Sequence, residues 1–175
     1  MRLLLAAALA LVVSPGTAWA CYARTDVSTD ALVRQSDLVV RARATGYEAT
    51  SGPARLGEPG TVIQFAVLEV LRGGKDAPLG LRIPGTLIER DDFNDRPAPY
   101  SMVRPGGRDG SCFARTYRNG GEFLLFLKKG QDGAYTPYWA ALAPVNEQLR
   151  SAHDPWIEAV RDIVARVPRI AARLE

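Results

Sequence analysis

Five short stretches of apolar and β-branched residues, separated by turn residues, limit the folds open to this chain. The clearest runs from Thr61 to Arg72, where Ile63, Phe65 and Val67 share one face. Alternation of this kind is typical of a strand with one buried side. The other predicted strands are Leu38 to Ala44, Leu79 to Leu87, Glu122 to Lys128 and Ala134 to Ala140. Short strands at this spacing favour a small barrel or a sandwich, and periodicity alone does not choose between the two.

Two helices are expected at the two ends of this strand region. The stretch from Ser28 to Ser36 permits a short helix with a serine or threonine cap. Near the end of the chain, Asp154 is a good acceptor cap and Pro155 suits the first helical position. An apolar stripe then runs from Trp156 to Val167. We expect this stripe to pack the second helix on the strands, with Trp156 in the core.

The first twenty residues are predicted to be an export signal. Arg2 supplies the positive start, Leu3 to Val13 form an apolar run, and Ala18 and Ala20 are the small residues that a signal peptidase recognises. The run is too short to span a membrane, and no later stretch reaches the roughly twenty apolar residues of a membrane helix. We therefore expect a secreted or periplasmic protein that begins at Cys21 and has no transmembrane segment.

The charge of the chain argues against nucleic acid as a partner. The formal net charge is +3, and removal of Arg2 with the signal leaves +2. Acidic and basic residues are interspersed along the sequence. Nucleic-acid binders usually carry a basic stripe with interleaved aromatic residues, which this chain lacks.

The two cysteines, Cys21 and Cys112, have two possible fates. In an oxidising compartment two cysteines without other thiols most simply pair. The bridge would close a loop of about ninety residues, worth roughly 4 to 5 kcal/mol in the chain-entropy picture. It would also hold the new α-amino group beside Cys112. Alternatively, Cys21 is acylated and anchors the protein to an envelope membrane, which leaves Cys112 unpaired.

Four features of the sequence are similar, in order and spacing, to those of a known family. They are Cys21 at the cleavage point, the stretch Ser36 to Ala42, the strand from Ile63 to Gly73, and Cys112 followed by Gly121 to Leu125. With them, the chain resembles the N-terminal, netrin-like domain of the tissue inhibitors of metalloproteinases. The resemblance implies a mainly β (α+β) fold, a five-stranded barrel of the oligonucleotide/oligosaccharide-binding (OB) type with a short N-terminal helix and a C-terminal helix. The resemblance covers roughly Cys21 to Leu149. Together with the predicted signal and terminal helix, the expected divisions are a signal peptide over 1–20, the barrel over 21–150 and the terminal helix over 151–175.

The resemblance also implies a function for the N-terminus. Cys21, bridged to Cys112, would chelate the catalytic zinc of a secreted metalloprotease through its amine and carbonyl, and displace the water that the protease activates. Tyr22 would enter the pocket beside that zinc. The chain departs from the family at Ala23, where the family has a second cysteine. The expectation is an exported, protein-binding inhibitor without a cofactor or a metal of its own; the alternative is a structural or accessory envelope protein that uses the same fold without chelation.

Other polar residues are interpreted as structural, and we predict no enzymatic activity. His153 is the sole histidine, so it is expected on the surface, and neither a nucleophile–histidine pair nor a multi-histidine zinc site is expected. The polar segment 89–110 is predicted to be a long surface loop. Its oxygen-bearing residues are interpreted as a solvated turn: Asp91, Asp92, Asn94 and Asp95. Residues on predicted strands are expected to face solvent (Glu69, Glu122) or to lie in the core and rim (Tyr135, Tyr138, Trp139).

Overall fold

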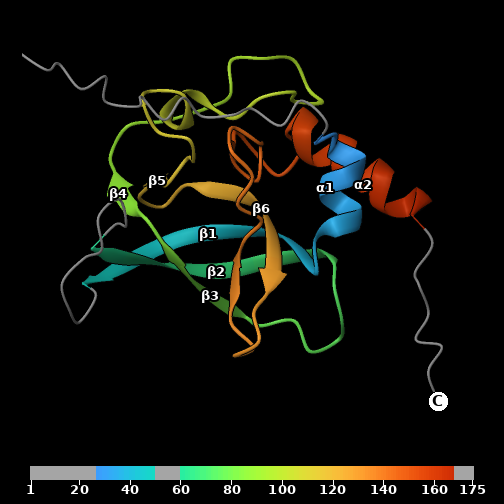
Figure 1. Cartoon of the computed structure of the whole chain (residues 1–175), viewed down its shortest axis with the longest axis horizontal. Helices are drawn as coiled ribbons and strands as arrows, with labels where there is room; N and C mark the ends of the chain where they lie inside the picture. The colour runs from blue at the N-terminus through green and yellow to red at the C-terminus, as the bar shows by residue number, and fades with distance from the viewer. Residues whose placement is uncertain (1–26, 50–59, 168–175) are drawn as a thin grey trace, which may run out of the picture.

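The computed structural model describes residues 27–49 and 60–167. The predicted signal peptide, Cys21, Tyr22 and the end of the chain from residue 168 lie outside the described residues. The described part is mainly β, with two α-helices and an antiparallel sheet (Figure 1). This confirms the α+β class that the sequence indicates. No helix in the described part is long and apolar enough to cross a membrane.

Six strands form one antiparallel sheet in the order β3-β2-β1-β6-β7, and β8 also pairs with β6. The bounds are β1 (Leu38–Ala49), β2 (Thr61–Arg72), β3 (Gly80–Pro84), β6 (Glu122–Lys129), β7 (Tyr135–Pro137) and β8 (Asn146–Leu149). A second, parallel pair is formed by β4 (Thr86–Ile88) and β5 (Thr116–Arg118). The helices are α1 (Thr29–Gln35) and α2 (Pro155–Arg166), with a 3₁₀ turn, η1, at Pro105–Gly107.

The helix caps that the sequence predicts are present. Ser28 Oγ accepts a hydrogen bond of 3.2 Å from Ala31 N at the start of α1. Asp154 Oδ1 accepts one of 2.9 Å from Trp156 N, and Pro155 occupies the first turn of α2. Each cap satisfies a backbone N–H that the helix itself cannot pair. Both predicted helices are thereby confirmed.

Strand β6 is buried on both faces because a hydrophobic core lies on each side of it. Leu124 and Phe126 belong to the core that α1 and α2 cover, which we call the helix-side core. The alternate residues Phe123, Leu125 and Leu127 belong to the core enclosed by β1, β2, β3 and β5, the strand-side core. All five side chains are fully buried. The nearly continuous apolar sequence of β6 is therefore explained by its position between two hydrophobic cores.

Trp156 is fully buried in the helix-side core, as predicted. Its ring lies 4.8 Å from that of Tyr100 and 6.1 Å from that of Phe126, measured between centroids. Figure 1 shows α1 and α2 beside each other on one side of the sheet, and the two helices contact each other. The apolar stripe of α2 thus packs the helix onto β6 and α1.

The large sheet is curled but open. Its edge strands β3 and β7 contact each other, yet no ladder of hydrogen bonds joins them, and no sheet in the described ranges is closed. The structure therefore bears out the class of the expected fold and leaves the closed barrel unconfirmed.

The structure corrects the expected number of strands. Five were expected, whereas eight are found among the described residues. The interruption foreseen at Pro84–Gly85 is confirmed, because β3 ends at Pro84 and β4 begins at Thr86. A Cβ at Gly85 would lie 2.6 Å from the carbonyl oxygen of Arg115, so glycine is needed where the chain between β3 and β4 passes the start of β5. The strands β5 and β8 were not predicted.

Candidate functional site

Cys112 lies half-buried in the segment between η1 and β5. Its carbonyl oxygen accepts a hydrogen bond of 2.8 Å from Leu142 N, and the Leu142 carbonyl accepts one of 2.9 Å from Val103 N. No cysteine among the described residues is a free thiol. Because Cys21 and Tyr22 fall outside those residues, their bridge and zinc-binding roles stay predictions.

An aromatic cluster adjoins Cys112. The rings of Phe113 and Trp139 meet edge to face at 5.5 Å, and the Arg115 guanidinium carbon lies 5.4 and 5.3 Å from their centroids. All three side chains are half-buried. We call Cys112, Phe113, Arg115 and Trp139 the Cys112 surface. Tryptophan, phenylalanine and arginine with partial exposure are the residues enriched at protein interfaces.

The other predicted aromatic residues have ordinary structural positions. Tyr135 packs against the strand-side core and Tyr138 against the helix-side core, both partly buried. Tyr138 and Trp139 lie beyond β7, which ends at Pro137, so the prediction that placed both on the strand is wrong. The position of Trp139 after the strand allows its ring to reach Phe113.

The segment 89–110 contains a buried ionic network, which corrects the prediction of a solvated turn. Arg104 is fully buried, and its Nη1 donates to Asp92. Its Nε donates to the Asn146 carbonyl at 2.9 Å and its Nη2 to the Thr116 carbonyl at 2.5 Å. The guanidinium also lies over the rings of two core aromatics, Tyr117 and Phe123. A buried charge is destabilising unless an opposite charge and hydrogen bonds compensate for its lost hydration.

Glu147 on β8 ties the same network to the loop. Its Oε1 accepts from Arg104 N at 3.1 Å, and its Oε2 accepts from Asn94 Nδ2 at 3.1 Å. Burial raises the pKa of Glu147 to about 7, although the Arg104 charge opposes this shift. Asp92 and Asn94 are thus interior residues, whereas Asp91 and Asp95 are exposed as predicted.

Glu69 and Glu122 meet on either side of one arginine. Arg41 Nε lies 3.2 Å from Glu69 Oε2, and Arg41 Nη1 lies 2.8 Å from Glu122 Oε2. Arg161 on α2 lies 2.7 Å from Glu69, and its hydrogen bond lowers the pKa of that carboxyl. For Glu122, burial acts to raise the pKa, but hydrogen bonds from Arg43 and Arg41 make the net shift downward. Both carboxylates are therefore held as partners in ion pairs.

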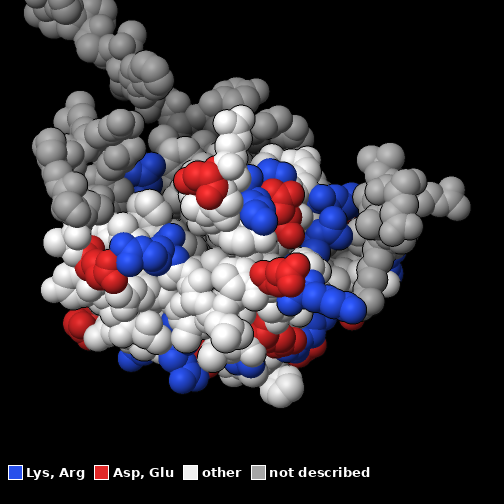
Figure 2. Space-filling model, turned by 90° about the horizontal axis from the view of Figure 1, so that it is seen from below, with Lys and Arg blue, Asp and Glu red and all other residues white. Residues whose placement is uncertain are grey.

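His153 is strongly exposed, with 87% of its side chain accessible, as the sequence predicts. Its Nδ1 lies 3.3 Å from Glu158 Oε1. Within residues 27–49 and 60–167, no group of three or more His, Cys, Asp or Glu side chains is arranged to hold a metal ion. On the face shown in Figure 2, acidic and basic side chains are intermixed and no continuous basic stripe appears.

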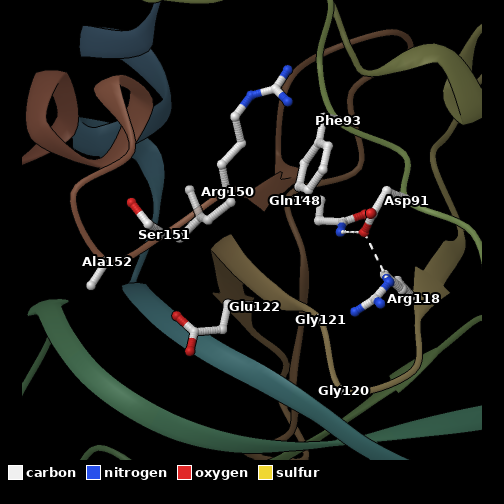
Figure 3. A pocket seen from close by; sticks show the side chains of 11 residues that line it. Asp91, Phe93, Arg118, Gly120, Gly121, Glu122, Gln148, Arg150, Ser151 and Ala152 are labelled. Carbon is white, nitrogen blue, oxygen red and sulfur yellow. Dashed lines mark hydrogen bonds and ion pairs between the residues drawn. The ribbon is translucent and has the colours of Figure 1, made fainter.

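A polar pocket of about 330 Å³ lies at the junction of the 89–110 loop, the β5–β6 turn and the chain after β8 (Figure 3). We call it the Arg118 pocket. Arg118 and Asp91 face each other on one side of it, while Arg150 and Phe93 lie on another (Figure 3). Sequence reasoning missed this site because its residues come from three distant segments. The remaining lining includes Gly120, Gly121, Glu122, Gln148, Leu149, Ser151 and Ala152.

Comparison with models of known protein families finds no match, and comparison with the curated proteins finds none either.

Proposed function

We propose that this chain is an exported binding domain that contacts another protein through the Cys112 surface. The observation that carries the proposal is the half-buried cluster of Phe113, Arg115 and Trp139 beside Cys112. A rigid aromatic pair with an arginine stacked on it loses little entropy on binding, and such groups dominate the affinity of protein interfaces.

The backbone around Cys112 supports the same proposal. The hydrogen bonds from Leu142 to Cys112 and from Val103 to Leu142 fix this segment between two other loops. A contact surface that is ordered before binding costs less free energy to engage. We also propose that the fold is a barrel of the OB type. The curled sheet supports this, because it brings the edge strands β3 and β7 into contact.

The specific form of the proposal is metalloprotease inhibition through Cys21. A bridge to Cys112 would place the α-amine and carbonyl of Cys21 on the Cys112 surface, where both can bind a target's zinc. Tyr22 would then contact the pocket of the protease. The amine must lose its proton to bind metal, so inhibition would weaken as the pH falls below the amine pKa of about 7.7 to 8.

The experiment compares three versions of the exported protein against secreted zinc endopeptidases. The first begins at Cys21, the second has one alanine added before Cys21, and the third has one alanine added after Glu175 as a matched control. We expect inhibition by the first and third alone. Equal inhibition by the version extended before Cys21 would refute chelation.

The broader binding proposal is tested separately by Trp139→Ala. Loss of this central aromatic residue should weaken capture of the protein partner at least about tenfold. Tyr47→Ala removes an aromatic side chain that is 63% accessible and lies outside the Cys112 surface, and it should leave capture unchanged. Equal effects of the two substitutions would contradict the assigned surface.

Intact mass of the exported protein decides between a bridge and a lipid anchor. A disulfide removes two hydrogen atoms, whereas acylation of Cys21 adds hundreds of daltons. Acylated Cys21 would favour the alternative function, an accessory envelope protein without chelation.

A further inference from the structure

The Arg118 pocket shares no residue with the Cys112 surface. Asp91 positions Arg118 by contacting one edge of its guanidinium: Arg118 Nε lies 2.9 Å from Asp91 Oδ1. Gln148 Nε2 donates to the same oxygen at 2.7 Å, and Gln148 Oε1 accepts from Asp92 N at 2.8 Å. The carboxylate that holds Arg118 is thus itself held by a strand residue.

The outer edge of Arg118 stays available to a ligand. Asp91 is its sole side-chain ion-pair partner within the described ranges, and 41% of the Arg118 side chain is accessible. The Nε atom is buried and its contact with Asp91 lacks hydrogen-bond geometry, so the terminal nitrogens are the donors left to face the pocket. Two parallel N–H groups of a guanidinium match the two oxygens of a carboxylate.

A second guanidinium lies at a separate place on the pocket. The Arg150 guanidinium carbon stands 4.4 Å from the centroid of Phe93, and Nη2 makes a long hydrogen bond of 3.3 Å to the Asn94 carbonyl. Figure 3 shows the Arg150 guanidinium beside Phe93, away from Arg118. Stacking on the ring restricts the side chain while leaving nitrogen donors open.

The acidic lining residues do not leave an uncompensated negative charge. Glu122 lies 2.8 Å from Arg41 and 2.7 Å from Arg43, so both of its oxygens are paired. Asp91 is paired with Arg118. Because the Arg118–Asp91 pair carries no net charge, Arg118 offers an anionic ligand the N–H donors of its outer edge. Arg150, which has no ion-pair partner among the described residues, offers an uncompensated positive charge at a separate point.

We propose that the Arg118 pocket binds a small ligand with two carboxylate groups, one on Arg118 and the other near Arg150. A volume of about 330 Å³ suits a small organic acid or one or two residues of an acidic peptide. Both candidate ligands carry two carboxylates. A peptide backbone links the carboxylates in the acidic peptide but not in the small organic acid.

The test is a titration of the intact protein, followed by NMR of the Gly120 and Gly121 amides and by calorimetry. The probes are acetate, unbranched dicarboxylates of increasing length, and a capped Glu-Glu dipeptide. We expect saturable binding of one dicarboxylate length or of the dipeptide, tighter than that of acetate. Tighter binding of the dipeptide assigns a peptide ligand, and tighter binding of the free acid assigns a metabolite.

Substitutions of the two arginines test whether they bind the carboxylates. Arg118→Gln should lower the affinity for every probe at least about tenfold, because a charge-assisted bidentate contact is lost. Arg150→Gln should remove the preference for dicarboxylates over acetate. Arg34→Gln is the matched control, since Arg34 also pairs with one aspartate, Asp30, but lies on α1 outside the pocket. Absence of saturable binding, or equal losses in Arg34→Gln, would overturn the proposal.

Discussion

Replacement of Asp92 by alanine should destabilise the protein strongly, because the charge of Arg104 would stay buried without its counter-ion. Arg104 is fully buried and Asp92 is 8% accessible, so water cannot replace the missing carboxylate without opening the loop. The substitution also removes the acceptor of the Gly106 N–H, which donates to Asp92 Oδ1 at 2.9 Å.

The magnitude follows from these losses. Removal of one partner from a buried ion pair typically costs about 3 to 5 kcal/mol. Arg104 keeps its hydrogen bonds to the carbonyls of Asn146 and Thr116, which limits the cost of the orphaned charge. The unpaired Gly106 N–H adds about 1 kcal/mol. We therefore expect the free energy of unfolding to fall by about 4 kcal/mol.

The assay is equilibrium unfolding in urea at pH 7.5, with the slope of free energy against urea compared between variants. Asp95→Ala is the matched control, since Asp95 lies in the same loop and pairs with Arg108 at 2.5 Å but is 59% accessible. Solvent screens an exposed pair of this kind, so it contributes little to stability. Asp92→Ala must therefore cost several times more than Asp95→Ala.

A loss below about 1 kcal/mol in Asp92→Ala, with an unchanged slope, would refute the reasoning. The double variant Asp92→Leu with Arg104→Met provides the second check. It removes both charges, so it should recover a large part of the stability that Asp92→Ala loses.

Three further predictions concern stability. Burial raises the pKa of Glu147 from 4.5 to about 7, so this residue contributes stability that is complete below pH 4.5 and lost as the pH rises through about 7. Urea unfolding at pH 5 and pH 8 should show that loss, on the order of 3 kcal/mol, reduced in Glu147→Gln and not in Glu158→Gln. Trp156→Ala should cost about 3 to 5 kcal/mol by thermal or urea unfolding, because it empties the helix-side core; a cost below 1 kcal/mol would contradict that packing. Gly85→Ala should cost more than about 2 kcal/mol through its clash with the Arg115 carbonyl, and Gly110→Ala, which has open space at φ 71°, only about 1 kcal/mol; equal melting temperatures would disprove the crowding at Gly85.

The helices and the main strands could be predicted because their signals are local. A capping aspartate followed by proline starts a helix without help from distant residues, and alternation along β2 reports one buried side. The strand β8 gives no such signal. Its residues Asn146–Leu149 are mostly polar, yet all four are buried. The three polar side chains bond to the 89–110 loop and to the β5 region, and Leu149 packs in the helix-side core. Hydropathy cannot reveal a buried strand whose partners are polar.

The candidate sites were predictable to different degrees. The cysteine count alone singles out Cys112 as a candidate residue. The contact between the rings of Phe113 and Trp139 could not be predicted, because it depends on the fold and not on a local sequence pattern. The same holds for the Arg118 pocket, where Asp91 and Gln148 meet from positions 57 residues apart. In the sequence, Arg104 lies in a polar loop, and such a residue is expected to be solvated. It can be buried because hydrogen-bond acceptors from distant segments surround its guanidinium.

The position of β6 between two cores sets an order of unfolding. Loss of α2 would expose Leu124 and Phe126 while Phe123, Leu125 and Leu127 stay enclosed on the opposite face. The amides of β6 should therefore exchange with deuterium last, and those of α2 earlier, at a lower opening free energy. A protease that attacks the detached helix would meet a residual sheet still organised around this one strand.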